Sequence, residues 1–256
     1  MNEQFMPVAL ADIETKVRQH LESLPGSIDS FLEQHIQASN HYLITAGSES
    51  AGFASIYDST LITQFVVDEP FRKYGQQLFE HLRRMEQVQS AFVPTCDEFY
   101  LAHALDEYRQ LEKQAYLFRS APSSMRSAVG WHWALELASA GDAEFIQRHA
   151  GDFFDPLEQR IEAGELFLTL RQGECAGFGS LVRSAFHADV ASIGMFTVES
   201  HRHKGVGTAT ITMLIEKCST TGLRAVAGCA YSNHLSKQTL ERAGMYSPTR
   251  LLRVEF

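Results

Sequence analysis

The sequence predicts an α/β fold that contains two copies of one structural unit. Two blocks recur at the same offset of 125 residues: residues 33–38 resemble residues 158–163, and residues 51–55 resemble residues 176–180. Two matching blocks in one register indicate a duplicated unit. The second copy also alternates strand-like and helix-like apolar patterns, which is the order expected of an α/β fold.

The first copy is expected to span residues 1–122 and the second copy residues 126–256. The segment 120–124 is small, polar and contains a proline, so it is the expected linker. Beyond the two blocks, the copies stay aligned after one inserted residue in the first copy. The aligned segments are Phe65–Val67 with Phe196–Val198, and Arg72–Gly75 with Arg202–Gly205.

The second copy shows each expected element in its own pattern. Alternating apolar residues over 131–137 predict a strand, and residues 166–170 and 176–182 predict a hairpin around Gln172-Gly173. Residues 191–198 form a strand pattern whose alternation changes phase, which suggests a β-bulge. The remaining elements are helical stretches at 145–146 and 157–161, a helix at 205–218, a strand at 225–230, a helix at 235–243 and a strand at 250–256.

The segment with the clearest chemistry follows the strand that ends at Val198. Its sequence, Arg202-His203-Lys204-Gly205-Val206-Gly207-Thr208, leads into the predicted helix. Glycines allow close approach of the backbone to a ligand, and a helix N-terminus binds anions through its unpaired N–H groups. The spacing is not that of a P-loop, and the first glycine of a dinucleotide-binding fingerprint is missing. The segment is therefore a predicted phosphate-binding loop of another type.

This loop resembles the signature of the GNAT superfamily of N-acetyltransferases, Q/R-x-x-G-x-G/A after a bulged strand, and 202–207 fits every fixed position. Asn233-x-x-Ser236 followed by Gly244-Met245 resembles a second family element, N-x-x-A/S … G-F/M. The resemblance covers residues 126–256. It implies two GNAT-like domains in tandem, each with a central mixed β-sheet flanked by helices.

The resemblance also implies a binding site for acetyl-CoA (coenzyme A) as co-substrate. The backbone of Phe196, Thr197 and Val198 would hold the pantetheine arm and the acetyl carbonyl. Asn233 would bond to the pantetheine, and Ser236 would lie beside it. The residues expected at the pyrophosphate are Arg202, His203, Lys204, Gly205, Val206, Gly207 and Thr208.

Catalytic roles are less completely specified. A backbone N–H at Val198 is the expected contact for the tetrahedral oxyanion. The family's general-acid tyrosine falls on Leu240 here, so Tyr231 is the candidate acid, with Tyr246 as an alternative. A protonated amine also needs a base or a water chain. The base candidates are Asp189, His187 and Glu199.

The first copy departs from the family pattern at two positions. Gln77 stands where the second glycine belongs, and Asp97 stands near the position of Asn233. The side chain of Gln77 would crowd a phosphate at this loop, and the carboxylate of Asp97 would repel it. We therefore expect residues 1–122 to form a degenerate GNAT-like domain with a structural or substrate-shaping role.

The composition excludes several other classes. The formal net charge of the 256-residue chain is -9, which argues against a nucleic-acid partner. No apolar run reaches the roughly 20 residues of a membrane span, and the N-terminus lacks signal-peptide features, so a cytoplasmic protein is expected. Cysteine and histidine spacings suggest no metal site.

The expected function is acetyl-CoA-dependent transfer of an acetyl group to the primary amine of a small-molecule acceptor by direct attack. The missing tyrosine leaves open a catalytically silent acyl-CoA-binding sensor. A longer acyl-CoA donor and a protein acceptor are further alternatives. The duplication predicts that the two sheets meet, in a pseudo-symmetric monomer or in a homodimer.

Overall fold

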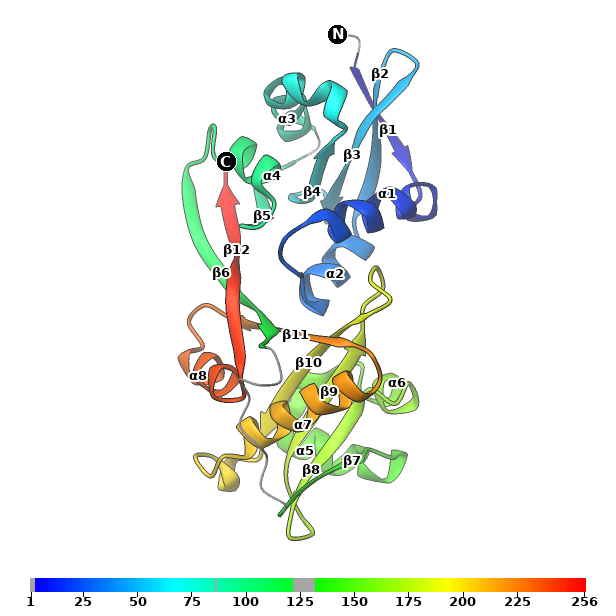
Figure 1. The fold of residues 1–256 in the computed structure, drawn as a ribbon. Helices are drawn as coiled ribbons and strands as arrows, with labels where there is room; N and C mark the ends of the chain where they lie inside the picture. The colour runs from blue at the N-terminus through cyan, green and yellow to red at the C-terminus, as the bar shows by residue number, and fades with distance from the viewer. Residues whose placement is uncertain (1–2, 86, 122–131) are drawn as a thin grey trace.

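A computed structural model describes residues 3–85, 87–121 and 132–256. All its strands form one twelve-stranded mixed sheet, which curves through both halves of the molecule (Figure 1). The N-terminal half contains β1 (Glu3–Val8), α1 (Leu10–Ser23), α2 (Ser30–Gln37), β2 (Asn40–Ala46), β3 (Glu49–Tyr57), β4 (Leu61–Val67), η1 (Glu69–Tyr74), α3 (Gly75–Arg84), β5 (Ser90–Pro94), α4 (Glu98–Ala104) and β6 (Gln110–Ser120).

The C-terminal half repeats this order of elements. It contains β7 (Trp133–Leu137), η3 (Ala140–Asp142), α5 (Ala143–Ala150), η4 (Gly151–Phe154), α6 (Leu157–Glu162), β8 (Leu166–Arg171), β9 (Glu174–Arg183), β10 (Val190–Thr197), η5 (Glu199–His201), α7 (Val206–Thr220), β11 (Arg224–Ala230), α8 (His234–Arg242) and β12 (Met245–Glu255). The predicted duplication of one unit is confirmed.

The two halves exchange their last strands. The strand order is β1-β2-β3-β4-β5-β12-β6-β11-β10-β9-β8-β7, so β12 lies between β5 and β6, and β6 pairs with β11. Figure 1 shows β6 and β12 running side by side from one half to the other. The two sheets therefore meet, as predicted, through strands that each half donates to the other.

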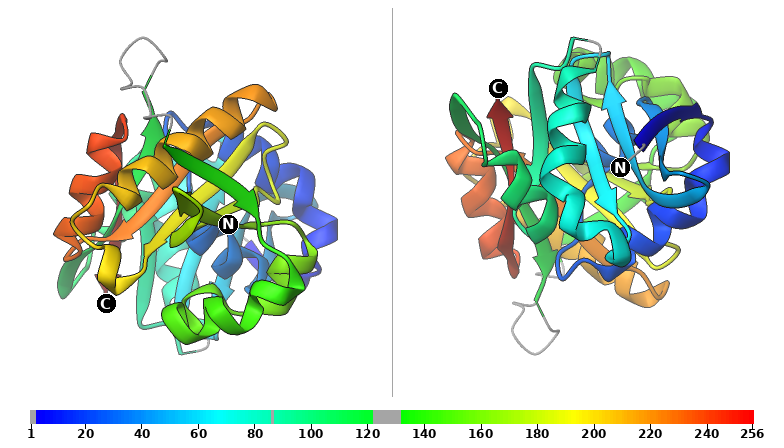
Figure 2. Two further views of the ribbon diagram at one scale, coloured as in Figure 1. Left: turned by 90° about the horizontal axis from the view of Figure 1, so that it is seen from below. Right: turned by 90° about the horizontal axis from the view of Figure 1, so that it is seen from above.

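Helices cover both faces of the sheet, and each layer has its own core. Helices α3 and α4 pack over β4 and β5, and α7 and α8 pack over β10, β11 and β6. Helices α5 and α6 cover β8 and β9. Helices α1 and α2 pack on the opposite face of the N-terminal half, and their core reaches Leu117 of β6 and Phe186 of the C-terminal half. The two views in Figure 2 show these layers end-on.

Most predicted elements of the second copy are found within a few residues of their expected bounds. The final strand is longer than predicted, because it begins at Met245 to pair with β6. The predicted β-bulge at 191–198 is wrong: β10 pairs with β9 from Ala191 to Thr197 without a register shift. Both faces of β10 are covered: Met195 packs in the core under α7 and α8, and Phe196 packs in the core under α5 and α6, which explains the changed alternation. Trp131, Arg126 and most of the predicted linker lie outside the described residues.

Candidate functional site

A fork between two parallel strands forms the candidate site. Strands β10 and β11 pair only from Val190 to Ser192 with Arg224 to Val226, and they diverge beyond that point. Both strands end at the same edge of the sheet, where the loop before α7 and the start of α8 also lie. The structure thus brings the predicted segments 196–208 and 231–236 to the two sides of one fork, without the bulge expected to create it.

The loop at this edge has the backbone shape of an anion site. His203 and Gly205 have φ angles of 61° and 82°, and Gly205 is the N-cap of α7. The first N–H groups of that helix have no partner within the helix and face outward with its positive dipole end. The exposed loop residues include two cations, and Lys204 Nζ donates to the Ser200 carbonyl at 2.9 Å. This geometry suits a diphosphate.

The hydrogen bonds of β10 show that the backbone N–H groups nearest the acyl group differ from those predicted. The Val198 N–H donates to the Ala176 carbonyl at 3.1 Å, so it is not free for the predicted oxyanion contact. Backbone groups alternate between the two neighbours of a strand. Phe196 and Val198 therefore face β9, whereas Met195 and Thr197 face the fork. The sequence alone could not show which of these backbone groups face the fork, because that depends on the register between β10 and β9.

The residues at the start of α8 lie at the other side of the fork. Asn233 is the N-cap of α8, and its Oδ1 accepts from the Ser236 N–H at 3.0 Å. This cap leaves the Asn233 side-chain N–H₂ as the donor available to a pantetheine amide. Close packing explains why the second glycine of the motif, Gly207, has no side chain. A Cβ at this position would lie 3.0 Å from Thr239 Cγ2.

Tyr231 follows β11 and contacts two residues of β6 from the N-terminal half. Its ring stacks on Tyr116 of β6, with centroids 4.5 Å apart, and Lys113 Nζ lies 4.5 Å from the ring centroid. Hydrogen bonds from Tyr116 and Lys113 lower the pKa of Tyr231. Sequence analysis missed both partners, because they approach through the exchanged strand. Leu240, at the family's tyrosine position, is buried in the core.

The other acid and base candidates are placed less favourably. Asp189 precedes β10, at the strand end far from the loop, and two hydrogen bonds from Arg224 lower its pKa. His187 lies in the same turn, and burial lowers its pKa. Tyr246 accepts a hydrogen bond from Arg119. Glu199 is exposed in η5.

The corresponding fork of the N-terminal half is filled. Strands β4 and β5 pair only at Leu61 and Ile62, but the Tyr100 side chain of α4 occupies the gap and its hydroxyl donates to the Ile62 carbonyl at 3.0 Å. Phe65 and Phe99 stack beside it, with ring centroids 6.0 Å apart. The cavity that remains has a volume of about 10 Å³.

The loop of the N-terminal half also lacks the anion-binding shape. Gly75 has a right-handed helical conformation, with a φ of -53°, and its N–H donates to the Arg72 carbonyl. Asp97, the counterpart of Asn233, caps α4 and contacts His20 Nε2 at 2.8 Å. Gln77 donates to the Glu3 carboxylate at 2.7 Å, which places a negative charge beside this loop. These features agree with the predicted degeneracy.

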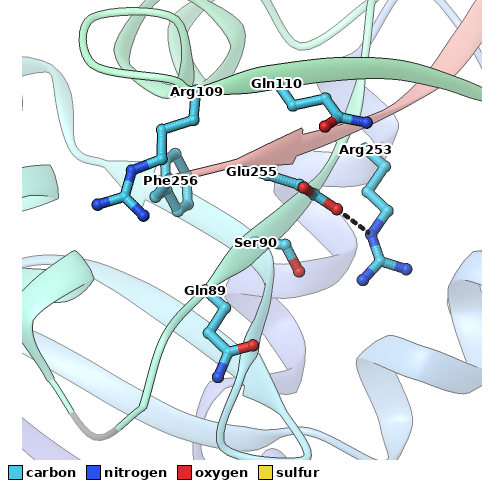
Figure 3. Close-up of a pocket in the computed structure, with 7 residues that line it drawn as sticks. All are labelled: Gln89, Ser90, Arg109, Gln110, Arg253, Glu255 and Phe256. Atoms are coloured by element: carbon cyan, nitrogen blue, oxygen red, sulfur yellow. Dashed lines mark ion pairs between the residues drawn. The ribbon is translucent and has the colours of Figure 1, made fainter.

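A separate polar pocket of about 430 Å³ lies where β5, β6 and β12 converge (Figure 3). Arg253 and Glu255 of β12 form an ion pair along its wall, with Nε and Oε1 3.6 Å apart. None of its lining residues belongs to the fork. Within the described ranges, no group of three or more histidine, cysteine or acidic residues could hold a metal, and no helix is long and apolar enough to cross a membrane.

Comparison with known proteins identifies both halves. Residues 9–121 match the model of an acetyltransferase (GNAT) domain, and residues 130–245 match that of the acetyltransferase (GNAT) family. No curated protein matches the chain in sequence.

Solved structures share the whole architecture. A GNAT-family acetyltransferase from Colwellia psychrerythraea superposes with a TM-score of 0.88 at 18% identity, covering 100% of both chains. A tandem GNAT protein from the clavulanic acid biosynthesis pathway, solved without AcCoA, gives a TM-score of 0.63 at 12% identity over 99% of this chain and 98% of that one. A GCN5-related N-acetyltransferase from Sphaerobacter thermophilus gives 0.61 at 12% identity over 99% and 95%. With both halves matched, the chain belongs to the GNAT acetyltransferases and consists of two GNAT domains in tandem.

Proposed function

We propose that the C-terminal domain transfers an acetyl group from acetyl-CoA to a primary amine of a small molecule. The observation that carries this proposal is the divergence of β10 from β11 beyond Ser192, next to a loop that contains the left-handed Gly205. The filled fork of the N-terminal domain makes one active site per chain the expected stoichiometry.

The proposed reaction is direct attack of the amine on the thioester. An alkyl amine with a pKa near 10.4 must first lose a proton at neutral pH. The Met195 and Thr197 N–H groups, which face the fork, are our candidates for stabilising the tetrahedral oxyanion. Tyr231, with its lowered pKa, is the candidate proton donor to the leaving thiolate.

The leaving thiolate needs only a weak proton donor. Coenzyme A leaves as a thiolate whose basicity we estimate from cysteine, with a pKa of about 8.5. Water could also protonate such a group. We therefore expect the protonation of the leaving thiol to depend on Tyr231 only modestly.

Thermal unfolding with acetyl-CoA tests the binding half of the proposal. Acetyl-CoA at about 100 times its dissociation constant should stabilise the wild type by roughly 2.7 kcal/mol. Gly205→Glu should abolish this shift, because it introduces a carboxylate and disfavours the left-handed turn. Gly173→Glu is the matched control, since Gly173 has a φ of 85° in the β8–β9 turn and its added Cβ would also meet no atom.

Two outcomes of this experiment decide the proposal. A shift that is lost only in Gly205→Glu supports cofactor binding at this loop. No shift in a folded wild type would reject the proposal. After a positive result, thiol release from acetyl-CoA should be measured with a panel of amino acids, amino sugars and aminoglycosides.

The alternative is a silent acyl-CoA-binding protein. It is favoured by one observation, the buried Leu240 at the position of the family's tyrosine, with 3% of its surface exposed. Binding of acetyl-CoA without release of thiol to any amine class of the panel would favour this alternative over an enzyme.

A further inference from the structure

A buried carboxylate of the N-terminal domain lies beside the fork of the C-terminal domain. Asp29 is the N-cap of α2, where its Oδ1 accepts from the Leu32 N–H at 3.2 Å, and only 7% of the residue is exposed. Its other oxygen, Oδ2, is directed at β11: a Cβ added to Gly228 would lie 1.8 Å from it. A carboxylate so placed has no role in the cofactor loop.

The register of the strands places Asp29 at the apex of the fork. The adjacent Ser30 N–H donates to Ser192 Oγ at 3.2 Å, and Ser192 is the last residue of β10 that pairs with β11. Gly228 lies two residues beyond Val226, the last residue of β11 that pairs with β10, and it is exposed. Asp29 therefore lies where the two strands begin to separate.

Asp29 approaches from the face opposite to α8. Cys229 and Tyr231 pack with the core under α7 and α8. Side chains alternate along a strand, so Gly228 presents the other face. The acetyl group would thus have Tyr231 on one side of the sheet and Asp29 on the other.

Several contacts across the domain boundary hold this end of α2 in place. Glu33 accepts hydrogen bonds from the Ser184 hydroxyl and from the Ala185 N–H. Arg18 of α1 donates to the Phe186 carbonyl at 3.0 Å. Figure 1 shows α2 directed at the C-terminal half. These bonds fix the distance between Asp29 and β11.

Burial raises the pKa of Asp29 above its ordinary value, and the bond from Leu32 and the nearby His35 oppose this only in part. The other titratable groups near it are Glu33 of α2 and Cys229 of β11. A carboxylate with a raised pKa is a better match to a general base at neutral pH.

We propose that Asp29 accepts the proton of the substrate amine, so that the N-terminal domain supplies the base for the site of the C-terminal domain. This inference rests on the proposed function. The ammonium N–H bond breaks as an O–H bond forms on Asp29, and the neutral amine then forms the new C–N bond. The C–S bond breaks, the thiolate takes the remaining surplus proton from nitrogen directly or through Tyr231, and Asp29 releases its proton to water.

The variant Asp29→Asn tests the proposal, because asparagine retains an N-cap of similar quality. With the best amine of the panel, kcat/KM should fall by about 100-fold or more, and the acid limb of its pH profile should disappear. Asp97→Asn is the matched control: it replaces another buried N-cap carboxylate, in the filled fork. Its rate and pH profile should equal those of the wild type.

A second measurement requires no amine. In a ¹³C NMR titration of aspartate carboxyls, saturating acetyl-CoA should move the Asp29 resonance and its midpoint, and leave Asp97 unchanged. The resonance is assigned by its loss in Asp29→Asn. An Asp29 resonance whose chemical shift and titration midpoint are unchanged by acetyl-CoA would overturn the proposal.

The two proposals fail in different ways. If the wild type shows no thermal shift with acetyl-CoA, the proposed function itself fails. If Asp29→Asn shows the normal thermal shift together with a wild-type rate and pH profile, only the role of Asp29 is wrong. Gly228→Ala adds a positional test, since the new methyl would displace the carboxylate and should lower kcat/KM as Asp29→Asn does.

Discussion

The two GNAT domains keep the same forked strands but differ at three corresponding positions around them. Gly75 is right-handed where Gly205 is left-handed, Gln77 replaces Gly207, and Tyr100 replaces Ser236. Tyr100 fills the N-terminal fork, whereas the corresponding residue of the C-terminal fork is the smaller Ser236. The comparison shows that the two forks differ by one aromatic side chain and by the conformation of one turn.

The largest expected effect comes from Tyr100→Ala. Removing this fully buried ring should lower the free energy of unfolding by about 3–5 kcal/mol, the range for large aromatic residues replaced by alanine. Urea denaturation measures it, and Ser236→Ala at the corresponding position should change stability far less. A loss below about 1 kcal/mol for Tyr100→Ala would contradict the filled-fork interpretation.

Replacing Gly207, the second glycine of the loop motif, should have the next largest effect, on the affinity for acetyl-CoA. Gly207→Gln should weaken acetyl-CoA binding by at least about tenfold, or 1.4 kcal/mol, because its Cβ would press on Thr239 and its amide would reach into the loop. Calorimetric titration measures this affinity. The reverse change, Gln77→Gly, should create no second binding site, because Tyr100 remains; two acetyl-CoA molecules per chain would refute this.

A pH-dependent difference in stability should follow from Asp29. Its folded-state pKa is raised, so ionisation favours the unfolded state as pH rises above the unfolded value of about 3.9. Asp29→Asn should therefore be more stable than the wild type at pH 7, and the difference should shrink as pH falls toward 4. Urea unfolding across this range measures it. Equal stabilities at pH 7 would show that the folded protein does not raise this pKa.

The smallest expected effect is that of Tyr231→Phe. We expect a reduction in kcat of roughly threefold to tenfold, because water can replace a donor to a leaving group of modest basicity. Steady-state thiol release measures it. Tyr246→Phe, at a residue that accepts its hydrogen bond from Arg119, should leave kcat unchanged. An unaltered kcat in Tyr231→Phe would remove Tyr231 as the acid.

The sequence predicted the duplication, the order of elements and the glycine turn that leads into α7, because each depends on local signals. Glycines at fixed spacing and periodic apolar residues specify turns, strands and helices without reference to distant segments. The degeneracy of the first domain was also readable at Gln77 and Asp97. The filling of its fork by Tyr100 was not, since a tyrosine on a helix is ordinarily part of a core.

Contacts between the halves escaped prediction for a physical reason. The partners of Tyr231 arrive on β6, and Asp29 reaches β11 from α2, so both depend on how two sheets join. The assignment of Met195 and Thr197 to the fork depends on one backbone bond, from Val198 to Ala176. No local pattern in the sequence encodes such long-range register.

The exchanged strands also govern how this protein can be made. β12 lies between β5 and β6 of the N-terminal half, yet it follows every other strand in the chain. During synthesis the sheet of the N-terminal half therefore stays incomplete, with the edge of β5 exposed, until residues 245–255 leave the ribosome. An exposed strand edge invites pairing with other chains. Chaperone dependence and sensitivity to C-terminal truncation are thus expected even for the N-terminal half.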